Sequence, residues 1–179
     1  MANQWTWMLC ILLTGQLHQL QAKEREVKLH KIEKIREDEH AFRSELHLGE
    51  RDEEGHLLIN GELKQHETVD NDWKLHIKIH RAENPDDEFE EFLNIPHLAV
   101  CDVMKSYYKE FFYESLKEYS NAPHPDTCPL PPEHYHLRDY PLDARRLGRF
   151  LIPGYYRFVS KLTKDDEIKI EYLLELQVN

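Results

Sequence analysis

Residues 73–80 read WKLHIKIH, with an apolar side chain at every second position and a basic or imidazole side chain between them. Successive side chains of a β-strand point to opposite faces, so this pattern predicts a strand that is buried on one face and solvated on the other. Residues 42–48 and 57–64 show the same alternation on either side of a turn region between Gly49 and Gly55. We therefore expect half-buried antiparallel strands in this part of the chain.

The C-terminal segment carries the same pattern twice. Apolar side chains alternate over residues 156–162 and again over residues 168–178, and the polar run Lys164-Asp165-Asp166 separates the two. Two alternating runs joined by a short polar turn predict a β-hairpin.

Two other segments depart from the regular alternation. Residues 27–35 begin in alternation and lose it at Lys31 and Ile32, which predicts an edge strand or a bulge. Residues 81–91, centred on Asn84-Pro85-Asp86-Asp87, predict an acidic, solvated loop. We expect no cation site in this loop, because calcium-binding loops need ligands at ordered spacing and usually a glycine turn.

Helical periodicity is found between Cys101 and Cys128. On a helical wheel of about 100° per residue, seven apolar or aromatic residues fall in one arc of about half the circumference. They are Met104, Tyr107, Tyr108, Phe111, Phe112, Leu116 and Tyr119. The pattern predicts one amphipathic helix over about residues 102–119, capped near Asp102. Five prolines between Pro123 and Pro132 predict an extended path after it.

Many strands and a single helix predict a mainly β protein. We expect an antiparallel β-sandwich or a half-open β-cup that carries one amphipathic helix. Two sheets packed on their apolar faces either close into a solid core or stand apart and leave a cavity. The sequence pattern leaves both alternatives open.

The first 22 residues contain no Asp, Glu, Lys or Arg. Trp5–Leu13 form an apolar run of the length of a secretory h-region, and a plausible cleavage point follows Ala22. A membrane-spanning helix needs about 20 apolar residues, so a membrane anchor is the less favoured interpretation. We expect residues 1–22 to be a signal peptide and residues 23–179 to form one secreted β domain.

The cysteines agree with an oxidising destination. Cys10 lies in the predicted signal peptide, which leaves Cys101 and Cys128 to form one disulfide. The predicted helix is about 25 Å long, and residues 120–128 can span about 30 Å when extended. Cys128 can therefore return to Cys101 if the proline-rich segment runs back along the helix. A catalytic cysteine is the alternative, but it leaves the second cysteine unexplained.

Charge and motifs exclude several classes of function. The chain has 34 acidic and 23 basic residues, a net charge of −11, which disfavours nucleic acid as a partner. It contains no G-x-G-x-x-G, P-loop, G-x-S-x-G or H-E-x-x-H motif. We therefore expect no enzymatic activity, no catalytic residues and no cofactor.

Two polar clusters suggest alternative functions, a metal site and a surface that binds anionic groups. His134 and His136, with His124 and Asp126, contain zinc-ligand residue types, but no third ligand is fixed by spacing, so we expect no metal site. The basic residues at 145, 146 and 149 could meet an anionic lipid headgroup or an acidic patch of a partner. Neutralising nearby aspartates is their simpler role.

Several C-terminal segments carry a family resemblance. They are CPLPPEHY at 128–135, LRDY at 137–140, RFLIPGYYR at 149–157, and the C-terminal hairpin. Together they resemble a large family of secreted dipteran proteins, most of which have no assigned function. The likeness covers roughly residues 73–178 and includes Cys101-Asp102. That family is similar to the insect chemosensory B-type proteins and, more distantly, to the ML lipid-recognition proteins, which commonly hold several disulfides where this chain can form one.

The resemblance implies an immunoglobulin-like β-cup of ML type that binds a lipid or other hydrophobic small molecule outside cells, with contact chemosensation as one setting. It implies no catalysis. Seven aromatic residues are the candidates for lining such a pocket: Trp73, Phe111, Phe112, Tyr155, Tyr156, Phe158 and Tyr172. The alternative is a secreted protein-interaction or receptor-accessory protein with a filled core and no small-molecule ligand. Its partner would be an extracellular receptor.

Overall fold

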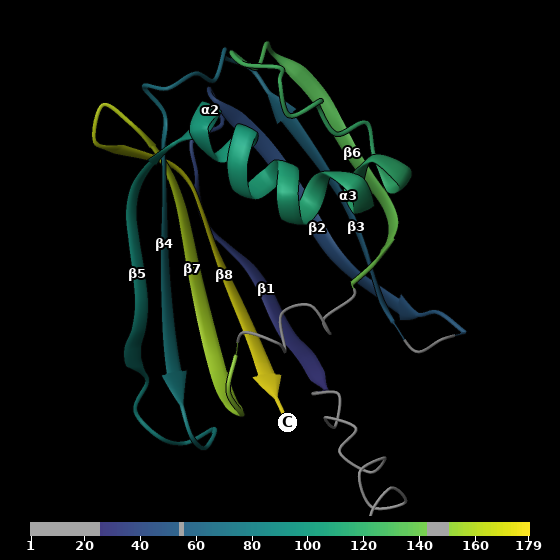
Figure 1. Cartoon of the computed structure of the whole chain (residues 1–179), viewed down its shortest axis with the longest axis vertical. Helices are drawn as coiled ribbons and strands as arrows, with labels where there is room; N and C mark the ends of the chain where they lie inside the picture. Colours follow the sequence, from purple (N-terminus) through teal and green to yellow (C-terminus); the bar gives the residue numbers. More distant parts are fainter. Residues whose placement is uncertain (1–25, 54–55, 143–150) are drawn as a thin grey trace, which may run out of the picture.

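The structure is a computed structural model that describes residues 26–53, 56–142 and 151–179. The predicted signal peptide, residues 1–22, lies outside the described residues. The described residues form eight strands and one helix (Figure 1). The strands are β1 (Val27–Glu37), β2 (Phe42–Arg51), β3 (Leu57–Gln65), β4 (Lys74–Ala82), β5 (Glu90–Ala99), β6 (Glu133–Pro141), β7 (Gly154–Lys164) and β8 (Glu167–Val178).

The strands form two antiparallel sheets. The larger sheet has the order β1-β8-β7-β4-β5, and the smaller has the order β2-β3-β6. Consecutive strands β1 and β2 belong to different sheets, so the sheets meet at this edge and diverge from it (Figure 1). The helix consists of α2 (Val100–Val103), η2 (Met104–Phe112) and α3 (Tyr113–Tyr119), and crosses from the end of β5 to β6. The predicted mainly β fold, a sandwich or cup with one helix, is confirmed.

Register explains why the larger sheet has one apolar face. Leu75 of β4 pairs with Leu162 of β7, which pairs with Ile170 of β8. Two residues further along each strand, the same face carries Ile77, Ser160 and Tyr172. The strand predicted at 73–80 and the C-terminal hairpin are both confirmed. The hairpin turns at Asp165 and Asp166, with φ of 53° and 62°. Aspartate tolerates this left-handed conformation, which matches the twist of tight hairpins.

The edge strands depart from regular pairing. β1 lies at an edge of the larger sheet and its register shifts between Leu29 and Lys31 and again between Lys34 and Arg36, as its broken alternation predicted. β5 forms the other edge, and its pairing with β4 shifts twice. Each shift changes which side chains face inward. The regular alternation is therefore lost along β5, and its extent could not be predicted. For the same reason the loop expected over residues 81–91 is shorter and runs from 83 to 89.

The described residues form two clusters of buried side chains. The first contains Ala41, Phe42, Val69, Trp73, Met104 and Leu130, from β2, the helix and connecting segments, and Leu162 and Ile170 of the larger sheet pack against it. The second contains Ile79, Leu151, Tyr156, Leu176 and Val178 and covers the opposite end of the same face of the larger sheet. Each fully buried large apolar side chain contributes roughly 1.5–3 kcal/mol of hydrophobic free energy.

No helix within the described ranges is both long enough and apolar enough to span a membrane.

An apolar cavity beneath the helix

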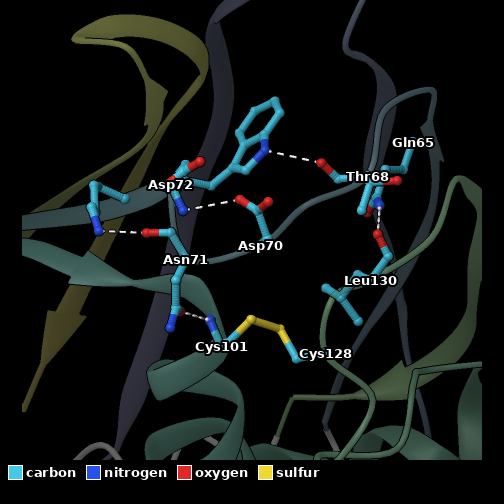
Figure 2. Close-up of a disulfide and its surroundings, with 10 residues drawn as sticks. Gln65, Thr68, Asp70, Asn71, Asp72, Cys101, Cys128 and Leu130 are labelled. Atoms are coloured by element: carbon cyan, nitrogen blue, oxygen red, sulfur yellow. Dashed lines mark hydrogen bonds between the residues drawn. A yellow bond between two sulfur atoms is a disulfide. The ribbon is translucent and has the colours of Figure 1, made fainter.

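The helix begins directly at the end of β5. Two backbone donors hold its first turn. The N–H of Val100 donates to the Trp73 carbonyl (3.1 Å). The N–H of Cys101 donates to Asn71 Oδ1 (3.0 Å), and this bond is drawn in Figure 2. These bonds satisfy donors that a helix N-terminus leaves unpaired. The cap expected near Asp102 is wrong, because the helix starts two residues earlier. Asp102 lies instead in the first turn, where a carboxylate is favoured by the helix dipole.

The predicted disulfide is confirmed. Cys101 and Cys128 are bonded, with their Cα atoms 5.6 Å apart. The proline-rich segment runs back along the helix, as the length comparison required. The Tyr108 hydroxyl donates to the Pro123 carbonyl (2.8 Å), and the rings of Tyr113 and His124 lie 5.3 Å apart. The helix is therefore tied to its own return segment along much of its length.

A cavity of about 470 Å³ lies between the helix and the two sheets. The smaller sheet contributes apolar side chains at Phe42, Leu46, Leu63 and Leu137, and the larger sheet contributes Leu75, Leu162 and Ile170. The helix contributes Val100, Val103, Met104, Tyr108 and Leu116, and the segments on either side of the smaller sheet's strands contribute Val69, Ala122, Pro123 and Leu130. The surface that these residues present to the cavity is therefore almost entirely apolar.

Most polar side chains at the cavity wall are bonded to the protein itself. Gln65 Nε2 donates to the carbonyls of Glu67, Leu130 and Pro131 at 2.9–3.0 Å. Burial raises the pKa of Tyr108 to about 12, with smaller contributions from Tyr113 and Tyr135, so its hydroxyl stays neutral while bonded to Pro123. The polar atoms of Gln65 and Tyr108 are therefore bonded to backbone carbonyls of the wall, and the surface facing the cavity is left apolar.

One polar cluster stands at the wall where the two sheets meet. Ser44 Oγ of β2 lies 2.6 Å from the Tyr172 hydroxyl of β8, and both residues line the cavity. Ser44 also donates from Oγ to Glu37 Oε1 (2.8 Å), and Lys34 Nζ donates to both Glu37 carboxylate oxygens (2.8 Å). Burial alone would raise the pKa of Glu37, but the hydrogen bonds from Lys34 and Ser44 outweigh it and lower the pKa below its ordinary value.

The structure separates the seven aromatic candidates. Tyr172 lines the cavity. Trp73 is fully buried behind Phe42, with ring centroids 5.4 Å apart, and supports the wall without forming it. Tyr156 and Phe158 share the inner face with Tyr172 but lie toward its other end, in or against the second buried cluster.

The remaining three candidates also lie outside the cavity. Tyr155 alternates with Tyr156 along β7 and so points to the opposite face of the sheet. Phe111 and Phe112 are 41% and 48% exposed on the outside of the helix, where they line a second, more polar pocket of about 440 Å³ together with Tyr140.

The helix departs from the expected wheel because of its middle segment. η2 is a π-helix, in which hydrogen bonds join residues five apart and each turn holds more residues than an α-helix. A wheel of about 100° per residue therefore misplaces the residues that follow. Met104, Tyr108 and Leu116 still face the cavity, whereas Phe111 and Phe112 are rotated outward.

Several cavity residues were missed as candidates, although the sequence held a signal for them. Leu75, Leu162 and Ile170 are inward positions of strands that the alternation predicted. Met104 and Tyr108 belong to the predicted apolar arc. All seven candidates are aromatic, whereas most of the apolar wall is aliphatic.

The histidines considered for a metal are bonded separately. His134 Nε2 lies 3.2 Å from Glu62 Oε2, and His124 Nδ1 lies 3.6 Å from Asp126 Oδ2. In the part of the chain that the structure describes, no group of three or more His, Cys, Asp or Glu is placed to hold a metal ion. The basic residues at 145, 146 and 149 lie outside the described residues.

Comparison with known proteins gives one family match. Residues 75–158 match a family described as proteins of unknown function, DUF1091. The matched region runs from β4 into β7 and contains the helix and both disulfide cysteines. No curated protein matches the chain.

Proposed function

We propose that this protein is a secreted, non-enzymatic binding protein that holds a lipid or another hydrophobic small molecule in the cavity beneath the helix. The observation that carries the proposal is the cavity itself. Protein interiors are close-packed and few voids exceed the size of a water molecule. A space of about 470 Å³ with apolar walls falls within the usual range of small-molecule sites, about 300–1,000 Å³.

The position of the helix supports a lasting cavity. Its first turn is fixed near the end of β5 by the disulfide and by the Asn71 and Trp73 bonds. Its last turns meet β6, where Ser115 Oγ lies 3.2 Å from the Tyr140 hydroxyl and the rings of Tyr119 and Tyr140 are 5.8 Å apart. The helix thus bridges the two sheets opposite the β1–β2 edge and holds them apart.

The test is to look for the bound molecule. Residues 1–179 are expressed in a eukaryotic secretory host, and the purified protein is analysed by native mass spectrometry and by solvent extraction. We expect a hydrophobic molecule in the native complex and in the extract. Recovery of no such molecule, together with failure to bind added lipid, would overturn the proposal.

A matched pair of variants links binding to this cavity. Leu116→Trp adds bulk on the cavity side of the helix, and Phe112→Trp adds a larger ring on the exposed side. We expect Leu116→Trp to lower lipid occupancy at least several-fold and Phe112→Trp to leave it unchanged. Circular dichroism shows whether both variants keep the β fold.

Secretion is part of the proposal, and a disulfide between Cys101 and Cys128 is compatible with it. We expect the protein in the culture medium, with a mature N-terminus at Lys23 that peptide mass mapping of the secreted product detects. Retention of residues 1–22 in the secreted form would contradict the predicted signal peptide.

The finer assignment is to the chemosensory B-type and ML-like proteins. It rests on the segments at 128–135 and 149–157 together with a cup-shaped β fold that holds an apolar cavity open to solvent. Within that assignment the ligand is an external chemical signal. Recovery of a lipid from the body surface of the same species, and expression of the protein in contact-sensing organs, would support the chemosensory assignment. Expression of the transcript in all tissues would count against it.

A receptor-accessory role is the second candidate. Tyr107, Phe111 and Phe112 are 52%, 41% and 48% exposed on one side of the helix, and exposed aromatic residues favour protein interfaces. If the protein acts through a receptor, replacing all three residues by alanine should abolish signalling by that receptor while lipid occupancy stays unchanged. Loss of both together would point back to the cavity.

A further inference from the structure

In the polar cluster at the cavity wall, the geometry determines which groups donate and which accept each hydrogen bond. Glu37 accepts hydrogen bonds from Ser44 N (2.9 Å), Ser44 Oγ (2.8 Å) and Lys34 Nζ (2.8 Å). Its side chain is only 7% exposed. Three donors converge on this carboxyl group, and they hold the pKa of Glu37 low even though burial acts to raise it. The group is therefore an ionised carboxylate, which can only accept hydrogen bonds.

The ionised carboxylate orders the two hydroxyls beside it. A serine hydroxyl carries one hydrogen, and Ser44 donates that hydrogen to Glu37. Ser44 Oγ can then serve only as the acceptor in its 2.6 Å contact with the Tyr172 hydroxyl. Tyr172 is the donor in that contact, and its oxygen is left with lone pairs alone. Such chains polarise each member and strengthen the acceptor at the open end.

Two of the other hydroxyls at the wall are already bonded within the protein, and a third, that of Tyr135, is the competitor to be tested. Tyr108 likewise donates its hydrogen to Pro123, and Ser120 Oγ donates to the Leu116 carbonyl (2.6 Å). Tyr135 also lines the cavity, and its hydroxyl makes no hydrogen bond to the rest of the described chain. Tyr135 lies on β6, pairs with Leu63, and takes no part in the Glu37 chain. It is therefore a natural control.

We propose that the Tyr172 hydroxyl is the polar recognition point of the cavity and accepts a hydrogen bond from the ligand, so that the preferred ligand is a long-chain alcohol. An ether or ester of the same chain has no hydrogen to donate. An ionised fatty acid brings a second acceptor, and a second negative charge, toward Glu37. This inference rests on the proposed function, because it names the class of molecule that the cavity prefers.

Displacement of a purely apolar fluorophore measures this preference. Diphenylhexatriene is bound to the purified protein near pH 7 and displaced by tetradecanol, tetradecyl methyl ether, tetradecane or myristate. We expect tetradecanol to bind about twofold to twelvefold more tightly than its methyl ether, the range set by one net hydrogen bond. Myristate should be the weakest of the three polar probes.

Three variants test whether the Tyr172 hydroxyl causes the preference for alcohol over ether. Tyr172→Phe removes the acceptor and should reduce the alcohol-to-ether ratio to about one, whereas Tyr135→Phe should leave the ratio as it is. Ser44→Ala frees the Tyr172 hydrogen, so Tyr172 can donate to an ether oxygen and the ratio should fall. Diphenylhexatriene binding shows in each case that the cavity is still formed.

The outcomes separate the two proposals. If no probe displaces diphenylhexatriene, or the fluorophore itself does not bind, the binding function is overturned. If all probes bind but alcohol and ether bind equally, or if Tyr172→Phe keeps the preference, the binding function stands and the assignment of Tyr172 is overturned. A preference lost in Tyr135→Phe and retained in Tyr172→Phe places recognition on β6 and also overturns it.

Discussion

The two sides of the helix differ more than its sequence suggests. The inner side presents Met104, Tyr108 and Leu116 to the cavity, whereas the outer side exposes Tyr107 and Phe111, whose rings are stacked 6.5 Å apart. All five belong to one apolar arc on an ideal wheel. The π-helical segment divides that arc, because its wider turns carry some of the residues outward. A helix that looks like a core element in sequence thus closes a cavity with one side and offers a surface with the other.

Removing the disulfide should have the largest effect, because it fixes the inner side of the helix to its return segment. We expect Cys101→Ser combined with Cys128→Ser to lower the free energy of unfolding by about 2–5 kcal/mol. Urea unfolding of delipidated protein measures the change, and reduction of the wild type should reproduce it. An unchanged midpoint in both would mean that the helix is held by its packing alone.

Met104→Ala tests the packing of the inner side directly. Met104 is 6% exposed and belongs to the first buried cluster. We expect a loss of about 2 kcal/mol, at the low end for truncation of a buried methionine, because the side chain already borders a void. Thermal or urea unfolding measures it. A loss below that of the outer aromatic variants would remove the distinction between the two sides.

Glu37→Gln tests the polar wall that faces the inner side of the helix. The folded pKa of Glu37 is lowered, so its ionised form contributes stability above the ordinary glutamate value, about 4.3, and loses it as the pH falls through the folded value. We expect the variant to be about 1–2 kcal/mol less stable near pH 7, since hydrogen bonds to a charged group are lost.

The pH profile supplies the control for that substitution. Unfolding curves recorded at successive pH values should show the gap between wild type and Glu37→Gln narrowing as the pH falls below about 4. A gap that stays constant into the acid range would mean that Glu37 is not ionised in the folded protein. The direction assigned to the Tyr172 hydroxyl would then lose its basis.

The outer aromatic residues should matter least to folding. We expect Tyr107→Ala, Phe111→Ala and Phe112→Ala each to change the free energy of unfolding by less than about 0.5 kcal/mol, the range of surface substitutions. The same unfolding assay applies, and lipid occupancy should be unaltered. A large loss in any one would show that this side is also part of the core.

The strands were predictable because their signal is local. Alternation at 73–80 and across the C-terminal hairpin sets side-chain parity along each strand, and the register of β4, β7 and β8 respects it. Parity also placed Tyr156, Phe158 and Tyr172 together on one face. It could not say which end of that face would carry the cavity, because that depends on where the helix crosses.

The candidate site was predictable only in part. Of the seven aromatic candidates, Tyr172 lines the cavity and the other six lie elsewhere. Aromatic character alone does not predict which side chains line a cavity. The aliphatic members, such as Leu75 and Leu162, come from strands far apart in sequence. Ser44 and Glu37 gave no signal at all, since a hydrogen-bond chain between β1, β2 and β8 exists only once the two sheets meet.

The sequence by itself determined the β class, the one helix and the single disulfide, because alternation, apolar arcs and cysteine spacing act over a few residues or along a simple length. Tertiary structure alone decided that the sheets stand apart, that a π-helix divides the aromatic arc, and that Glu37 orients two hydroxyls at the wall. These features depend on contacts between distant strands, and no local pattern encodes how far apart two apolar faces will be held.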